Sequence, residues 1–227
     1  MSLDDTPLLP TPLYGLRTWS IVGDGGAERL AGPHRRTSWP ADGAWLDATC
    51  ALGSEHRPPG KGCNCGLHAW HPSRRSARRV LALRREVPGI VESQGAIEVH
   101  EDGFRAERAR PCVLFLAPGR NARLVHRLAK AYGARVVEVD GAGAVLDFCR
   151  ARGLGLDESG VVALLGPSTA EKIRRARRGQ ARADALRLAA AVAVAALLVV
   201  AGLQFATDPP GERVLHGRTG EIHINSR

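Results

Sequence analysis

The sequence lacks the short motifs that mark several large enzyme classes. It contains no G-x-x-x-x-G-K-[ST] phosphate loop, no G-x-S-x-G nucleophile elbow and no H-E-x-x-H zinc-protease motif. Two glycine-rich stretches, which begin at Gly23 and Gly141, lack the strand-to-helix context that a phosphate-binding loop needs. Enzymes that depend on these loops are therefore disfavoured. No internal repeat is visible either.

The beginning of the chain lacks the features of a secretory signal peptide. Residues 1–12 read MSLDDTPLLPTP, with neither a basic stretch nor an apolar one. The chain has five cysteines, an odd number, so a disulfide framework is disfavoured and reduced thiols are expected. We predict that the proline-punctuated residues 1–12 form a mobile arm.

The charge of the chain is unevenly distributed. A net charge of +9 would usually suggest nucleic acid as a partner. Seven basic residues and only two acidic ones lie between Glu171 and Arg187, however, so one short segment holds more than half of the excess. This segment is either a patch for lipid headgroups or nucleic acid, or a solvated helix face that signals membrane topology. We favour the topology signal, with anionic lipid headgroups near the densest basic positions and nucleic acid disfavoured. Those positions are Arg174, Arg175, Arg177 and Arg178.

Three of the five cysteines and three of the eight histidines lie between Cys50 and His71. Four potential metal ligands follow one another there with the spacing C-x5-H-x6-C-x-C, namely Cys50, His56, Cys63 and Cys65. Three cysteines and one histidine are a common composition for a structural zinc site, and the Gly- and Pro-rich loop between them can turn back on itself. The C-x-C spacing is tighter than the usual C-x2-C, and His68 or His71 can substitute for His56. The segment predicts a zinc-binding knuckle.

Other interpretations of these residues stay open. Buried cysteines often act as small apolar side chains, and Cys63 and Cys65 can face opposite ways. An iron–sulfur centre would need a fourth thiol from Cys112 or Cys149. A catalytic thiolate would need Cys63 or Cys65 to pair with a histidine. The histidines available for that pair are His56 and His100.

The pattern of apolar residues predicts an α+β domain over residues 13–167, with a β-rich first half and strand–helix–strand–helix order in the second. The predicted strands are residues 14–22, 90–100, 104–108, 112–117 and 136–139. The pair Asp102-Gly103 predicts a hairpin turn between the second and third of these strands. The predicted helices are residues 121–132, capped by Asn121 and ended by Gly133, and residues 144–151. Residues 72–85 form a strongly basic segment with a narrow apolar face, which also suits a helix.

Residues 188–206 form an uncharged apolar run in which only Gln204 is polar. This length suffices to cross the hydrocarbon core of a membrane, so we predict a single transmembrane helix. The basic residues 168–187 precede this run, and the segment that follows it contains the acidic Asp208. By the positive-inside rule, this asymmetry predicts that the folded domain is cytoplasmic and that residues 168–187 form a basic juxtamembrane helix. Residues 207–227 are then a short tail outside the plasma membrane.

Several motifs occur together in a fixed order. They are Tyr14-Gly-Leu-Arg-Thr-Trp19, Trp39-Pro, Cys50, His56-Arg-Pro-Pro59, Cys63-Asn-Cys-Gly-Leu67, His100-Glu-Asp-Gly-Phe-Arg-Ala-Glu107 and the stretch Leu128–Val137. In this order the chain resembles a group of actinobacterial membrane-anchored proteins of unknown function, over roughly residues 13–140. The resemblance implies that the knuckle and the Arg-Ala-Glu segment belong to one module, and implies no activity. Within that segment, His100 and Glu107 can support a metal site. We favour a structural ion pair between Arg105 and Glu107.

The sequence as a whole predicts a single-pass membrane-anchored module with a structural zinc site, acting in interaction or regulation through a protein partner. The first alternative is an enzyme with a Cys–His or metal-activated centre. The second is a nucleic-acid-binding protein that uses the basic residues 74–85 and 172–187.

Overall fold

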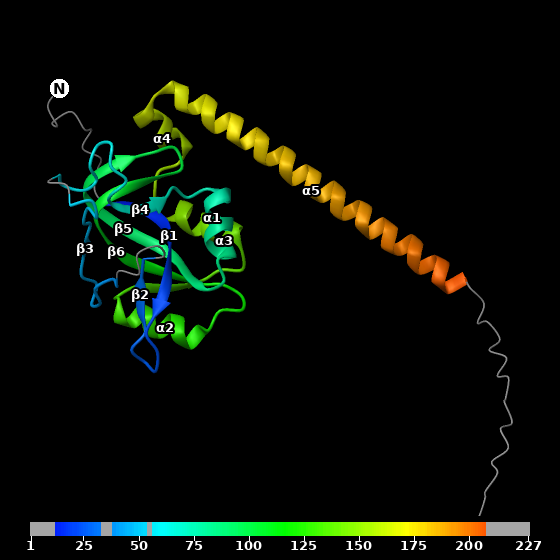
Figure 1. Cartoon of the computed structure of the whole chain (residues 1–227), viewed down its shortest axis with the longest axis horizontal. Helices are drawn as coiled ribbons and strands as arrows, with labels where there is room; N and C mark the ends of the chain where they lie inside the picture. Colours follow the sequence, from blue (N-terminus) through cyan, green and yellow to red (C-terminus); the bar gives the residue numbers. More distant parts are fainter. Residues whose placement is uncertain (1–11, 33–37, 54–55, 208–227) are drawn as a thin grey trace, which may run out of the picture. The chain divides into compact units, whose positions relative to one another are not determined.

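The computed structural model describes residues 12–32, 38–53 and 56–207 (Figure 1). Strands dominate the first half of the described chain and helices the second, which confirms the predicted mixed α+β class. The strands are β1 (Leu13–Val22), β2 (Arg29–Ala31), β3 (Leu46–Asp47), β4 (Leu67–Trp70), β5 (Glu86–Val99), β6 (Gly103–Leu116) and β7 (Arg135–Glu138). The helices are α1 (Arg74–Ala82), α2 (Ala122–Ala131), α3 (Ala142–Ala151), α4 (Glu158–Leu165) and α5 (Pro167–Thr207).

Strand β6 is the centre of the seven-stranded sheet. It pairs antiparallel with β3, β4 and β5, and parallel with β7. Strand β1 pairs with both β5 and β4, so the pairings β1–β5–β6–β4–β1 close into a ring. The last contact of the ring is a single residue pair, Leu16 with Trp70. Beside it, the guanidinium of the half-buried Arg17 donates to the backbone oxygen of His68 and lies 5.0 Å from the ring of Trp39. Burial lowers the pKa of Arg17 to about 10, which Glu86 partly offsets.

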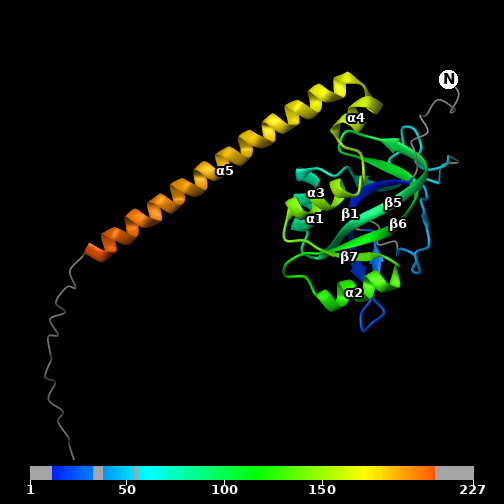
Figure 2. The same cartoon turned by 180° about the vertical axis from the view of Figure 1, so that it is seen from behind.

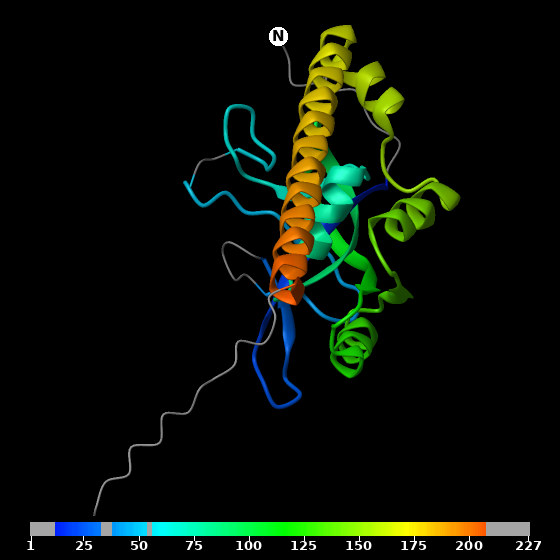
Figure 3. The ribbon, with the colours of Figure 1, turned by 90° about the vertical axis from the view of Figure 1, so that its right-hand side faces the viewer.

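The two faces of the sheet carry separate apolar cores. On β6, Leu114 points into a core that includes Val125 and Leu128 of α2. Its neighbours Val113 and Phe115 point into a second core with residues of α1 and α3. Helices α1 and α3 accordingly lie next to each other, and α2 lies apart from them (Figures 2 and 3). Both faces of the sheet are therefore covered.

Most of the local predictions are confirmed. The Asn121 side chain accepts from the Leu124 N–H at 3.1 Å at the start of α2, and Gly133 takes a φ of +61° just past its end. The predicted hairpin joins β5 to β6 through the turn that ends at Gly103. One boundary was wrong: residues 104–108 and 112–117 are not two strands but parts of one long β6. Pro111 does not break it because it sits opposite Val91 at a register shift, where a missing N–H is tolerated.

The chain divides into two units, residues 1–173 and 174–227. The predicted basic helix of residues 168–187 and the apolar residues 188–206 both lie within the continuous helix α5. Within the residues that the structure describes, no helix is both long enough and apolar enough to span a membrane. Several side chains of residues 188–206 fall outside the described set, as do residues 1–11 of the predicted arm 1–12 and residues 208–227 of the predicted tail 207–227. The transmembrane helix and its topology stay predictions.

Gly15 makes the close approach within the ring possible. A methyl group at this position would lie 2.7 Å from both the Ala69 Cβ and the Phe104 ring. We predict that Gly15→Ala lowers the free energy of unfolding by about 1–3 kcal/mol, measured by urea denaturation, because the core is overpacked. The matched control is Gly143→Ala in α3, where a Cβ meets open space; it should leave stability unchanged or raise it by up to ~1 kcal/mol. Equal effects would contradict this account of Gly15.

Candidate metal centre

Residues 48–66, which we call the ligand loop, connect two strands that both pair with β6. Strand β3 pairs with Arg108 and Ala109 of β6, and β4 pairs with the preceding residues 103–106. Residues 48–66, which connect β3 to β4, therefore begin and end side by side along β6. Cys50 lies just after β3, whereas Cys63 and Cys65 lie just before β4. Backbone pairing thus brings the two halves of the ligand set together.

The four predicted ligands converge. One ligand atom from each of Cys50, His56, Cys63 and Cys65 lies within 4.8 Å of all the others. The sulfur atoms of Cys50 and Cys63 are 3.7 Å apart. Tetrahedral zinc with Zn–S bonds near 2.3 Å places two sulfurs about 3.8 Å apart, so this edge already has the length that zinc requires. The His56 Nε2 lies 3.1 Å from the Cys65 sulfur, slightly closer than a bound ion would leave it.

Gly60 shapes the loop inside the ligand set. Its N–H donates to the Cys65 sulfur at 3.2 Å, and its carbonyl accepts from the Cys63 N–H at 3.0 Å. A methyl group at Gly60 would lie 2.1 Å from the His56 ring, so only glycine allows the imidazole to reach Cys65. The Pro-Pro-Gly sequence therefore serves the ligand geometry directly. An N–H donated to a cysteine sulfur also stabilises the thiolate that a metal needs.

Arg105 holds the ligand loop from behind. Its side chain is only 6% exposed, which is rare for arginine. One guanidinium nitrogen donates to the backbone oxygens of Cys63 and, at 3.0 Å, of Cys65. The other two nitrogens contact the Glu98 carboxylate and, at 3.2 Å, the His100 Nε2. Arg105 thus fixes the C-x-C segment to the β5–β6 hairpin while an acidic partner balances its charge.

Glu107 holds the loop at a second point. Its carboxylate accepts from the Arg57 Nε at 2.6 Å and from the Ala96 N–H at 2.9 Å, the latter at the irregularity in β5. Burial raises the pKa of Glu107, but the Ala96 N–H and the Arg57 guanidinium outweigh it and leave this pKa below its ordinary value. The predicted ion pair between Arg105 and Glu107 was wrong, because Arg105 pairs with Glu98 and Glu107 with Arg57. Both side chains instead support the loop.

The thiols of the cluster influence one another. A backbone hydrogen bond from Cys65 lowers the pKa of the Cys63 thiol, whereas burial and the neighbouring thiols of Cys50 and Cys65 raise it. The net pKa of Cys63 lies above its ordinary value. Because cysteine binds a metal as the thiolate, a cation that binds Cys63 must displace its proton.

The other two cysteines, and the other histidines that the structure describes, lie outside this cluster. Cys112 and Cys149 pack in the second core, where burial raises their pKa values to about 12 and about 11. They supply no fourth thiol for an iron–sulfur centre. His71 is a buried histidine whose Nε2 lies 3.0 Å from the His100 backbone oxygen, and burial lowers its pKa. Neither His71 nor His68 takes the place of His56.

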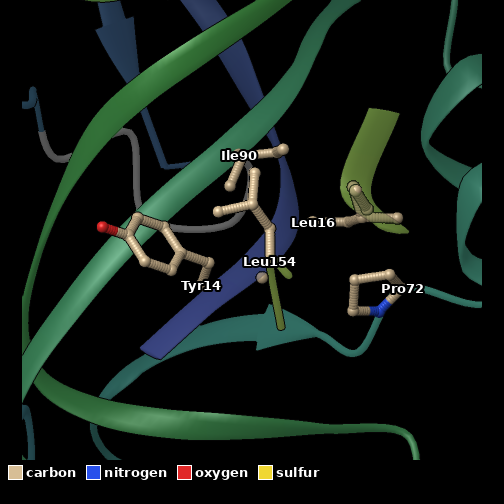
Figure 4. A pocket seen from close by; sticks show the side chains of 7 residues that line it. Tyr14, Leu16, Pro72, Ile90 and Leu154 are labelled. Carbon is tan, nitrogen blue, oxygen red and sulfur yellow. The ribbon is translucent and has the colours of Figure 1, made fainter. Parts of the chain in front are cut away.

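A small apolar pocket lies elsewhere, between β1, β5 and the residues after α3. Figure 4 shows Tyr14, Leu16, Pro72, Ile90 and Leu154 around it. It has no room for a water molecule and therefore none for a small-molecule ligand. Cys149 also lines it, with a thiol that stays protonated at neutral pH. This pocket therefore plays no part in the candidate metal centre.

The ligand set was predicted from the sequence, and so was the need for a Gly- and Pro-rich loop, which Gly60 illustrates. The roles of Glu98 and Arg57 were not predicted. Both act through contacts with residues of β6, which the spacing of the ligands does not reveal. Comparison of the chain with protein-family profiles, curated proteins and solved structures finds no match. The resemblance to an actinobacterial group stays a prediction.

We predict that Arg105→Met lowers the free energy of unfolding by about 2–3 kcal/mol in urea denaturation. The change leaves the Cys63 and Cys65 carbonyls and the Glu98 carboxylate without their donor. The control is Arg108→Met on the same strand, an exposed side chain 5.5 Å from the Trp45 ring, which should cost less than about 1 kcal/mol. If the two variants are equally stable, Arg105 does not hold the loop.

Proposed function

We propose that the chain is a single-pass membrane-anchored interaction or regulatory module whose cytoplasmic domain is stapled by a structural zinc ion. The observation that carries the zinc site is the convergence of four ligand atoms within 4.8 Å, with two sulfurs at the separation of a tetrahedral edge. His56 and the three cysteines complete the preferred coordination number of a structural zinc by themselves.

The closed ligand set favours a structural role over a catalytic one. Catalytic zinc sites keep one position for water or substrate, whereas here four candidate protein ligands lie within 4.8 Å of one another and suffice to fill a tetrahedral set. The enzyme alternative retains one supporting contact, the 3.1 Å separation of the His56 Nε2 and the Cys65 sulfur. That sulfur is buried and already accepts from the Gly60 N–H, so it is poorly placed to attack a substrate.

A structural zinc ion at this position would stabilise the connection between two short strands. Strand β3 has two residues and β4 has four, so each makes few hydrogen bonds with β6. The connection between them contains no helix or strand in its described part, and long irregular connections are expensive to order. A metal that joins Cys50 to Cys63 and Cys65 closes this connection at its base. Because the unfolded chain has no such site, binding stabilises the fold.

Membrane anchoring is supported by the apolar end of α5. The larger side chains described there are all more than half exposed: Val192 61%, Val194 57%, Leu197 69%, Leu198 69% and Val199 62%. A helix that is apolar on every side is poorly suited to water. The seven basic residues on its N-terminal side favour a cytoplasmic domain and a tail outside the plasma membrane. Anionic lipid headgroups would then neutralise Arg174, Arg175, Arg177 and Arg178.

The zinc proposal predicts one zinc ion per chain in the full-length protein purified in a mild detergent. Cys50→Ser and Cys63→Ser should each abolish stoichiometric zinc and lower the melting temperature by several degrees, because a thiolate ligand is lost. Chelation of the native protein should lower it similarly. Elemental analysis and thermal unfolding are the measurements.

The matched control for these variants is Cys112→Ser. Cys112 lies outside the cluster and donates to the Ile90 carbonyl at 3.3 Å, a bond that serine can replace. It should keep its zinc and its response to chelator. A native protein without bound zinc, whose melting temperature is unaffected by chelator, would rule out the staple.

The anchor proposal predicts that the full chain resists alkaline extraction from membranes. Val194→Arg combined with Leu198→Arg should release it, since each arginine costs about 2.5–3.5 kcal/mol at the centre of a membrane helix. Ala176→Arg with Ala183→Arg, in the basic part of the same helix, should leave it in the membrane fraction. Release of the native chain, or retention of the Val194/Leu198 variant, would refute the anchor.

A further inference from the structure

A second basic surface lies on the folded domain, far in sequence from the basic half of α5. It consists of exposed arginines on α1 and in the residues just after it, which we call the α1 basic face: Arg74, Arg75, Arg78, Arg79, Arg84 and Arg85. No acidic residue occurs between positions 72 and 85. Arg75 lies 3.8 Å from the carboxylate of the exposed Asp102. The face therefore keeps a strong positive charge.

The fold presents this face rigidly. The side chains of Ser73 and Ser76 form a reciprocal capping box at the start of α1. At its other end, the Arg120 guanidinium donates to several backbone oxygens beyond the last turn, including that of Leu83 at 3.0 Å. The opposite side of α1 buries Ala77 and Val80 in the second core. Little backbone conformational entropy is therefore lost when this face meets a partner.

The residues of the α1 basic face favour a partner that presents many phosphate groups on a smooth surface. Arginine binds phosphate through two parallel N–H groups, which suits densely spaced headgroups. Single-stranded nucleic acid needs exposed aromatic rings for stacking, but the Trp70 ring is covered by Arg79 at 5.3 Å. A nucleic-acid duplex is also bound through its phosphates, and arginine reads guanine in the major groove, so the arginines by themselves do not distinguish a duplex from a bilayer. Leu83, 39% exposed among the arginines, offers instead an apolar group that can enter a lipid interface.

We propose that the α1 basic face docks on an anionic lipid bilayer. The proposal uses the membrane anchor only to explain why a bilayer is close, and it does not depend on the zinc site. Contact would hold the folded domain against the membrane through a surface separate from α5. Its strength would depend on the anionic lipid content and would fall with rising salt.

The test is photocrosslinking with the full chain. Leu83 is replaced by p-benzoylphenylalanine, and the protein is reconstituted into vesicles of phosphatidylcholine alone or mixed with phosphatidylglycerol. We expect the yield of lipid crosslinks at position 83 to rise roughly tenfold in the anionic vesicles and to fall again at high salt. The control places the same group at Leu52, which is 82% exposed in the ligand loop and should show no such rise.

Charge variants test the role of the arginines. Arg74→Gln with Arg84→Gln should reduce the crosslink yield at position 83 by roughly tenfold in anionic vesicles. Arg123→Gln with Lys130→Gln removes the same charge from α2, which packs on the other face of the sheet, and should leave the yield unchanged. Equal effects of the two pairs would overturn the proposal.

Two other outcomes would also overturn it. One is an equal crosslink yield in neutral and anionic vesicles. The other is preferential crosslinking to a single- or double-stranded oligonucleotide added in competition with the anionic vesicles. Failure of the anchor is distinguishable, because a chain that cannot insert into neutral vesicles can still crosslink to anionic ones through position 83.

Discussion

The contact between the Arg105 guanidinium and the backbone of Cys63 and Cys65 is the interaction on which the candidate metal centre depends. Backbone oxygens in an irregular loop have no regular partners, and a buried one without a donor costs as much as a lost hydrogen bond. Arg105 supplies donors to two of them at once. Its own burial is tolerated because Glu98 lies on the other side of the guanidinium. One side chain of β6 thus determines where two ligands stand.

Strand β6 extends this role to the whole domain. It pairs along its length with four other strands, and its alternating side chains divide between two cores. Arg105 and Glu107 face the ligand loop at one end, whereas Phe115 at the other end contacts Phe148 of α3 at 6.0 Å. The centre therefore stands on the most extensively paired element of the sheet, which favours a fixed ligand geometry.

Features that depend only on residues close together in the sequence could be predicted from it. The Asn121 cap, the Gly133 stop and the Asp102-Gly103 turn depend on local backbone conformation. The four ligands were predictable for a similar reason, because they lie within sixteen residues of one Gly- and Pro-rich stretch. The partner of Arg105 was not, since the oxygen of Cys63 is 42 positions away and is reached only through the register of β4 on β6. The continuity of β6 through Pro111 likewise depends on a register shift in β5.

The ring of strands is closed between β1 and β4 by one residue pair and by the Arg17 contact with His68. A seam with so few hydrogen bonds opens at a lower free energy than the rest of the sheet, and such openings occur without global unfolding. Strand β4 follows Cys65 by a single glycine, so a metal that immobilises Cys65 also restrains one side of the seam. Zinc occupancy would thus determine how often β1 and β4 separate locally. The hydrogen-exchange rates of the β1 amides would then depend on whether zinc is bound, although β1 contains none of the ligands.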